Sequence, residues 1–179
     1  HPDPPNADTM GRGIFVLDAV TGDLLWRAGP GGTATSCTGH PCLLSGMNYA
    51  IPADITLVDR DYDGLIDRLY AADTGGNLWR VDLQPTGTGD ISTWQTTHLA
   101  DLGGTGATRR KFFFGPDVVP TRTFDAVMAI SGDREHPLLA HEARLIVNRF
   151  YMTKDTKVGA SAAGWTTLHD DSAATSNDS

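Results

Sequence analysis

The chain has 179 residues, a formal net charge of −8 and 40% hydrophobic residues. This length and apolar content suffice for one domain with its own core. The acidic balance argues against a nucleic-acid partner, and no apolar run approaches the roughly 18 residues that a membrane-spanning helix needs.

The first part of the chain predicts an extended segment followed by a hairpin. Residues 1–11 are rich in proline and polar residues, and they show neither a signal peptide nor an initiator Met. We therefore expect an extended leading segment, in a mature or excised piece of an exported protein. Residues 14–17 and 24–27 are apolar runs on either side of a turn that contains Gly22, which is the pattern of a β-hairpin.

Residues 28–50 form a Gly-rich insertion that contains both cysteines of the chain, Cys37 and Cys42. An even number of cysteines in such a loop fits a local disulfide better than zinc, which usually needs four ligands. Two free thiols and a metal site that includes His40 are the alternatives. A disulfide would indicate an oxidising, exported compartment.

Residues 59–67 carry the most specific motif in the chain, because aspartates stand at positions 1, 3, 5 and 9 of a loop with glycine at position 6. Calcium loops place oxygen ligands at alternating positions and a glycine at the sixth, where the backbone turns sharply. The expected ligands are the side chains of Asp59, Asp61, Asp63 and Asp67 and the main-chain carbonyl of Leu65.

The flanks of this loop indicate a calcium hairpin rather than an EF-hand. Residues 55–58 and 69–72 are short, apolar runs typical of strands. Position 12 is Tyr70, where an EF-hand has a bidentate Glu. An acidic loop without an ion and a magnesium site are the alternatives. We favour calcium because four close carboxylates repel one another, and Arg60 and Arg68 would offset only part of that charge.

The hairpin pattern returns after the acidic loop, which indicates an internal repeat. The pair Trp79-Arg80 lies 53 residues after Trp26-Arg27, and each pair follows an Asp…Thr-Gly turn. This spacing suits propeller blades with insertions. A weaker third unit is expected from strands at residues 94–99, 111–114, 118–119, 126–130 and 145–152.

These elements predict an all-β chain. Residues 12–154 would form about three propeller blades, and residues 155–179 a polar C-terminal tail. Because a closed propeller needs at least about four blades, we expect a partial set.

Enzyme motifs are weak in this chain. Ser131, Asp133 and His136 lie close in sequence, but catalytic triads come from distant segments, and no Gly-x-Ser-x-Gly motif is present. The run 103–106 lacks the Lys-Ser/Thr of a phosphate-binding loop. Trp26 and Trp79, at repeated positions, are expected in the core rather than in a sugar site. We therefore expect no enzymatic activity.

Several stretches together resemble a known family. Residues 17–26 resemble the repeat of quinoprotein propellers, and residues 59–67 are similar to the calcium hairpins of integrin-like propellers. With residues 131–137 and 148–151 in this order, they resemble the C-terminal propeller of the type IV pilus biogenesis and tip adhesin family, often called PilY or PilC. The resemblance covers about residues 11–154.

This resemblance implies a modified quinoprotein-like β-propeller with one calcium site. Calcium occupancy would regulate pilus extension and retraction, and hence twitching motility and adhesion. The implied partners are minor pilins and a host or abiotic surface, and the implied location is the periplasm, the outer membrane or the pilus tip on the cell surface. The chain has no Arg-Gly-Asp motif, so integrin binding is not expected. A fragment of a quinone-dependent dehydrogenase and a purely structural, calcium-stabilised propeller are the alternatives.

Overall fold

The computed structural model describes residues 7–83, 89–105, 109–135, 146–159 and 161–170. Within these residues the chain is all-β, as predicted, with one short 3-10 turn, η1 (Ile91–Thr93). The strands are β1 (Ile14–Leu17), β2 (Leu24–Pro30), β3 (Ser36–Thr38), β4 (Cys42–Leu44), β5 (Thr56–Val58), β6 (Arg68–Ala72), β7 (Asn77–Asp82), β8 (Gln95–Asp101), β9 (Asp117–Pro120), β10 (Asp125–Ile130), β11 (Phe150–Asp155) and β12 (Leu168–His169). No described helix is long and apolar enough to cross a membrane.

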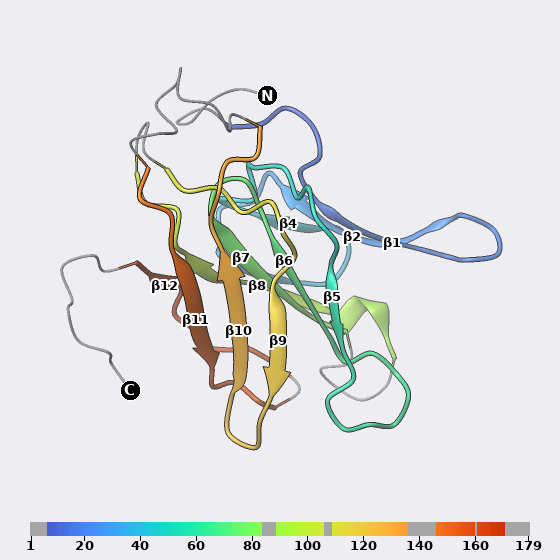
Figure 1. Cartoon of the computed structure of the whole chain (residues 1–179). Coiled ribbons are helices and arrows are strands. Elements are labelled where there is room, and N and C mark those ends of the chain that lie inside the picture. Colours follow the sequence, from blue (N-terminus) through green and yellow to red (C-terminus); the bar gives the residue numbers. More distant parts are fainter. Residues whose placement is uncertain (1–6, 84–88, 106–108, 136–145, 160, 171–179) are drawn as a thin grey trace.

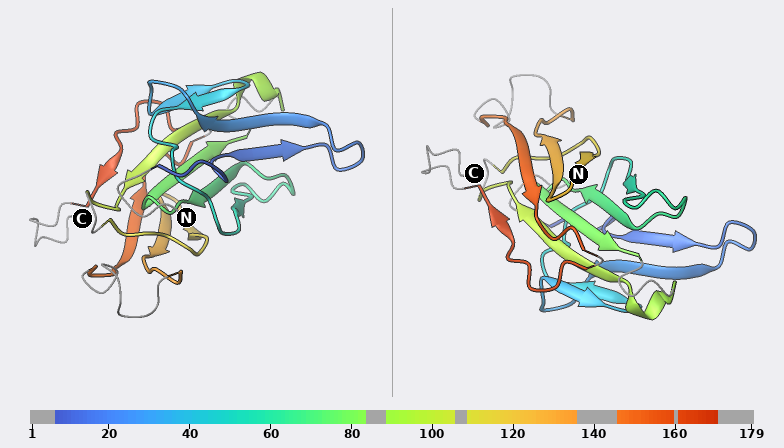
Figure 2. Two further views of the ribbon diagram at one scale, coloured as in Figure 1. Left: turned by 90° about the horizontal axis from the view of Figure 1, so that it is seen from above. Right: turned by 90° about the horizontal axis from the view of Figure 1, so that it is seen from below.

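The described strands form three sheets, which Figure 2 shows as successive layers. The first has the order β1-β2-β4, and the last has the order β11-β10-β9. The central sheet has the order β12-β8-β7-β6-β5, and β3 also pairs with β8. Its strands β5 to β8 follow one another as an antiparallel meander. This meander has the form expected of one blade.

The central sheet is covered on both faces. Every residue of β6 and β7 is buried. Because successive side chains of a strand point to opposite faces, these two strands supply two cores. Trp26 of β2 and Trp79 of β7 belong to the core shared with the first sheet. Leu78 of β7 and Val127 of β10 belong to the core shared with the last sheet.

The predicted first hairpin is confirmed. β1 and β2 pair antiparallel, with Val16 opposite Trp26. Asp18 starts the turn, because its side chain accepts hydrogen bonds from the amides of Val20 and Thr21, both at 2.8 Å. Gly22 has a φ of +78°, a conformation that glycine adopts without steric cost.

Other parts of the chain differ from the sequence prediction. The insertion at residues 28–50 contains β3 and β4, and β2 continues to Pro30. The stretch 111–114 forms only an isolated bridge between Phe112 and Ser131. β11 starts at Phe150 rather than residue 145, which lies outside the described residues. The tail contributes β12, which pairs in parallel with β8. β3 and β12 depend on pairing with the distant β8, which local patterns do not encode.

The three described sheets stack without closing into a ring. The all-β class is therefore observed, whereas the assignment of the sheets to blades of a propeller stays a prediction.

Candidate metal site

The acidic loop, residues 59–67, connects β5 to β6 at the lower right of Figure 1. Val58 and Arg68 pair at its base, and the amide of Asp67 donates to the carbonyl of Val58 at 3.0 Å. Strands flank the loop on both sides, as the sequence predicted. The two strands hold both ends of the loop together.

Three of the predicted ligands come together. Asp59, Asp61 and Asp67 each offer a carboxylate oxygen, and these oxygens lie within 4.8 Å of one another. Asp63 is not in this group, and its Oδ1 accepts a hydrogen bond from the amide of Leu65 at 2.8 Å. The side chain of Leu65 has no ligand atom, so only its main-chain carbonyl could serve the ion.

The backbone of the loop winds around Asp59. Its two carboxylate oxygens accept hydrogen bonds from the amides of Tyr62, at 2.7 Å, and Gly64, at 2.9 Å. Both donors lie in the left-handed region, with φ values of +63° and +91°. This conformation is costly for tyrosine, whose side chain is 81% exposed. The tight winding brings residues 61 and 67 back towards residue 59.

The donor set suits a hard cation. Carboxylate and carbonyl oxygens favour calcium, magnesium or manganese over metals that prefer sulfur or imidazole. Calcium accepts irregular geometry and six to eight oxygens, whereas magnesium requires a near-ideal octahedron. The residues present therefore fit calcium, which would supply positive charge among the carboxylates.

The guanidinium groups of the two arginines beside the loop form ion pairs outside it. The Nε of Arg60 is 3.0 Å from Oδ1 of Asp125 in β10. Arg68 is buried and pairs with Asp82, at 3.1 Å, and also with Asp125. Both side chains are thus engaged with Asp125 of the neighbouring sheet.

Arg68 belongs to a larger set of buried polar side chains that the sequence analysis missed. This buried charge cluster consists of Arg68, Tyr70, Arg80, Asp82, Asp125 and Asp155. Arg80 is 2.7 Å from Asp82 and 2.6 Å from Asp155. The hydroxyl of Tyr70 lies 2.7 Å from Asp155 and 3.0 Å from Asp125. The cluster therefore joins β6 and β7 of the central sheet to β10 and β11.

Burial keeps the Tyr70 hydroxyl of this cluster protonated. It raises the pKa of the Tyr70 hydroxyl well above its usual range, and the nearby Asp155 acts in the same direction. The hydroxyl is therefore a permanent donor to the carboxylates. A signal existed in the sequence, since polar residues alternate along two adjacent strands: Arg68 faces Asp82, and Tyr70 faces Arg80.

Comparisons with known proteins agree on one family. No protein-family profile matches the chain. Over 96 residues, 53% of its length, the chain is 29% identical to a type IV pilus biogenesis factor PilY1 homolog of Xylella fastidiosa. The crystal structure of the Pseudomonas aeruginosa PilY1 C-terminal domain covers 88% of the chain with a TM-score of 0.58 and 20% sequence identity. The chain resembles a PilY1 C-terminal domain.

The matches cover small parts of these relatives. The matched region spans 6% of the Xylella fastidiosa PilY1 homolog and 34% of the Pseudomonas aeruginosa PilY1 chain. The family resemblance predicted from the sequence is thereby confirmed. The structural likeness concerns the fold alone.

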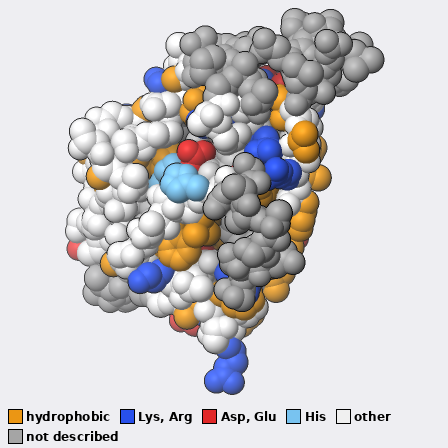
Figure 3. All heavy atoms as spheres, turned by 90° about the vertical axis from the view of Figure 1, so that its left-hand side faces the viewer, with side chains coloured by type: hydrophobic (Ala, Val, Ile, Leu, Met, Phe, Trp, Pro, Cys, Tyr) orange, Lys and Arg blue, Asp and Glu red, His pale blue; other side chains and the backbone are white. Residues whose placement is uncertain are grey.

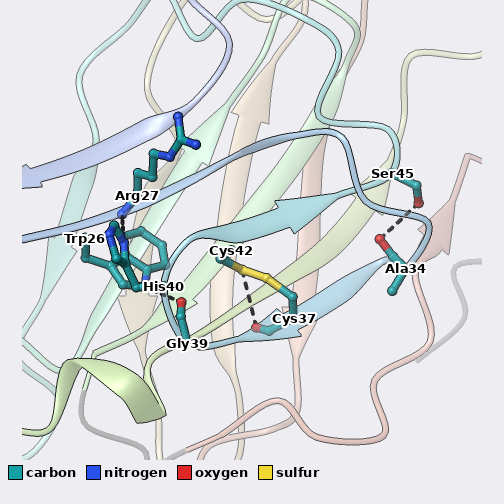
Figure 4. The surroundings of a disulfide bond; sticks show 8 residues. All are labelled: Trp26, Arg27, Ala34, Cys37, Gly39, His40, Cys42 and Ser45. Atoms are coloured by element: carbon teal, nitrogen blue, oxygen red, sulfur yellow. Dashed lines mark hydrogen bonds between the residues drawn. A yellow bond between two sulfur atoms is a disulfide. The ribbon is translucent and has the colours of Figure 1, made fainter.

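The cysteines of this PilY1-like chain are bonded to each other in the structure. Cys37 in β3 and Cys42 in β4 have a Cα–Cα distance of 5.6 Å (Figure 4). The Nδ1 of His40 accepts a hydrogen bond from the amide of Arg27 at 3.2 Å. His40 thus serves the backbone of the loop, and the geometry gives no support to a metal site at these cysteines.

The residues considered for a hydrolase do not form a triad among the described residues. The hydroxyl of Ser131 accepts from the amide of Arg149 at 2.7 Å and donates to Asn148 at 3.2 Å. Asp133 is 2.9 Å from the ammonium group of Lys111. His136 lies outside the described residues.

The repeated tryptophans are core residues, as predicted. Trp26 and Trp79 are both fully buried. The indole of Trp26 donates to the carbonyl of Gly39 at 2.8 Å, whereas that of Trp79 donates to Asp73 at 2.9 Å. The two residues therefore occupy equivalent core positions with different partners, and neither is free to bind a sugar.

Proposed function

We propose that this chain is a calcium-binding, non-enzymatic segment of a type IV pilus-associated adhesin and biogenesis factor. The observation that carries the proposal is the convergence of Asp59, Asp61 and Asp67 on a hairpin loop of a PilY1-like chain. Calcium occupancy of this loop regulates pilus extension and retraction, and with them twitching motility and adhesion.

In this proposal Asp59, Asp61 and Asp67 bind the ion through their side chains and Leu65 through its carbonyl. Asp63 joins after exchanging its bond to the Leu65 amide for the ion. The loop is largely exposed and lacks a bidentate Glu at position 12. Its affinity therefore falls near the weak end of the range, with a Kd on the order of 10⁻⁵ to 10⁻³ M. Such a site is filled at extracellular calcium concentrations.

The proposed location is outside the cytoplasm, at the periplasm, the outer membrane or the pilus tip. The Cys37–Cys42 disulfide supports an oxidising compartment. The proposed partners are minor pilins and a host or abiotic surface, which follow from the PilY1 resemblance.

We also propose that the three sheets are blades of a larger propeller. The outer face of the β9–β11 sheet supports this, because Ile130, Phe150 and Met152 are each at least half exposed there. Hydrophobic side chains line the right-hand edge of the molecule in Figure 3. Such a face suits packing against a further sheet.

Calorimetric titration of the purified protein with calcium tests the binding proposal. Wild type should bind one calcium ion, and Asp61→Ala should bind it at least about tenfold more weakly, because one carboxylate is lost. Asp117→Ala removes an exposed carboxylate of β9 and is the matched control. An absence of binding, or equal binding by wild type and Asp61→Ala, would refute the site.

Regulation requires more than binding, since any ligand of the folded state stabilises it. Cells that carry Asp59→Ala in the full-length protein should show altered pilus numbers and twitching at normal protein levels. Unchanged pili and motility would favour the purely structural role of calcium.

A further inference from the structure

Arg60 forms hydrogen bonds both within the acidic loop and to the neighbouring sheet. It stands between two predicted calcium ligands, and its amide donates to the carboxylate of Asp67 at 2.7 Å. Its side chain leaves the loop: Nε donates to Asp125 at 3.0 Å, and a terminal nitrogen donates to the carbonyl of Thr121. The loop and the β9–β10 turn lie at the same end of the molecule in Figure 1. Arg60 thus connects two segments about 60 residues apart.

The β9–β10 turn, residues 121–124, is a small unit closed by its own hydrogen bonds. The amide of Thr121 donates to the carbonyl of Phe124 at 2.9 Å, and the amide of Phe124 donates to the hydroxyl of Thr121 at 3.1 Å. Arg60 binds the carbonyl of Thr121 and the carboxylate of Asp125, where β10 starts. The guanidinium group therefore holds both ends of the turn.

The contact of Arg60 with Asp125 and Thr121 can form and break without unfolding the core. The side chain of Arg60 is 19% exposed, at the rim of the buried charge cluster. Asp125 is fully buried, but Arg68 and Tyr70 also contact it. Without Arg60, the Asp125 carboxylate would keep a charged and a neutral donor. Arg60 is thus the dispensable partner of this carboxylate.

Bound calcium would favour the bonds from the Arg60 guanidinium to Asp125 and Thr121, because it would neutralise the loop carboxylates that attract the same guanidinium. Without a cation, the loop carboxylates repel one another and compete with Asp125 for the Arg60 guanidinium. A bound cation neutralises them and fixes the loop backbone, including the Arg60 amide that is bonded to Asp67. A filled and an empty loop would then differ in how firmly Arg60 is held on the turn, which coupling between two sites requires.

We propose that Arg60 transmits calcium occupancy of the loop to the β9–β10 turn. This inference rests on the proposed calcium site and adds the route by which occupancy reaches the adjoining sheet. β9 and β10 carry part of the apolar outer face, so the order of this surface becomes calcium-dependent.

Amide hydrogen exchange with saturating calcium and with a chelator tests the proposal in wild type, Arg60→Gln and Arg122→Gln. Arg122 is exposed in the same turn, so its variant removes an equal charge and is the matched control. In wild type and the control, calcium should slow exchange of the Thr121, Thr123 and Phe124 amides at least about fivefold. In Arg60→Gln this slowing should vanish while calorimetry still shows calcium bound.

The possible outcomes separate the two proposals. If calcium binds but the turn exchanges equally fast with and without it, or if Arg60→Gln retains the full slowing, the transmission is wrong and the calcium site stands. If wild type binds no calcium, the site itself is wrong. Unchanged exchange in β6 and β7 of Arg60→Gln would show that the variant is folded.

Discussion

Trp79 and His98 lie face to face on β7 and β8, with ring centroids 4.3 Å apart and 18° between the ring planes. The Nε2 of His98 is 2.9 Å from Oδ1 of Asn77, and both side chains are buried. Burial lowers the pKa of His98 to about 4. The imidazole is therefore neutral in the folded protein at neutral pH, where it packs as an aromatic ring.

The lowered pKa of His98 predicts that the stability of the protein depends on pH. Below its usual pKa of 6.5, His98 binds a proton in the unfolded chain but not in the folded one, down to a pH of about 4. The free energy of unfolding therefore falls as the pH falls through this window, by about 3 kcal/mol in total. Urea unfolding of wild type and His98→Gln at several pH values measures the contribution of His98. The free energy of unfolding of the variant should not show the fall that His98 causes.

Wild type and His98→Gln must be compared because Asp73 changes the free energy of unfolding with pH in the opposite direction to His98. Burial raises its pKa to about 6, against hydrogen bonds from Trp79, Asn77 and Gly75. This carboxyl favours the folded state at low pH and loses that contribution as the pH rises to about 6. Parallel stability curves of wild type and His98→Gln would contradict the prediction for His98.

Removing a buried arginine should be far more costly than removing an exposed one. Arg80 and Asp155 are both 0% exposed and lie 2.6 Å apart. Arg80→Met leaves Asp155 and Asp82 with one cation fewer, so the free energy of unfolding should fall by about 3 to 5 kcal/mol. Arg149→Met breaks the partly exposed pair with Asp170 and should cost about 1 kcal/mol or less. Equal losses in denaturant unfolding would contradict the assigned role of the cluster.

Two glycines with the same backbone conformation should respond differently to alanine. Gly22 and Gly76 have φ values of +78° and +80°. A Cβ at Gly22 would meet no atom within 4 Å, whereas one at Gly76 would overlap the backbone of Gly103. Gly22→Ala should cost about 1 to 2 kcal/mol through φ alone. Thermal unfolding should show Gly76→Ala losing at least about 2 kcal/mol more.

The aspartates of the loop should differ in their importance for calcium. Asp61 already faces Asp59 and Asp67, whereas Asp63 is bonded to the Leu65 amide. Asp61→Asn should therefore weaken calcium binding more than Asp63→Asn, because the Asp61 carboxylate already lies with those of Asp59 and Asp67, whereas the Asp63 carboxylate must first move towards them. Calorimetric titrations of both variants give the comparison. A larger loss in Asp63→Asn would show that the loop rearranges when it binds the ion.

Much of the local structure could be predicted from the residues. The alternation of apolar residues and the Gly-containing turns identified the β1–β2 hairpin and the β6–β7 hairpin. The spacing of the aspartates identified a loop in which Asp59, Asp61 and Asp67 converge. These features depend on neighbours within about ten residues, so their pattern lies in the sequence itself.

Short strands whose partners are distant could not be predicted. β3 has three residues and pairs with β8 about 60 positions later, and β12 has two residues and pairs with β8 from the tail. No periodicity can be recognised in such short segments. Their existence depends on the edge that β8 presents once the central sheet has formed.

The sequence by itself determined the all-β class, the two hairpins and an acidic loop with the spacing of a calcium site, because turns and side-chain alternation are local. Only the tertiary structure decided where the arginines beside that loop point. Both Arg60 and Arg68 have Asp125 of β10 as a partner, 65 and 57 residues away. Stacking of the sheets brings Asp125 to both arginines, and burial then makes the pair of Arg68 with Asp125 obligatory, since an unpaired charge would be costly there.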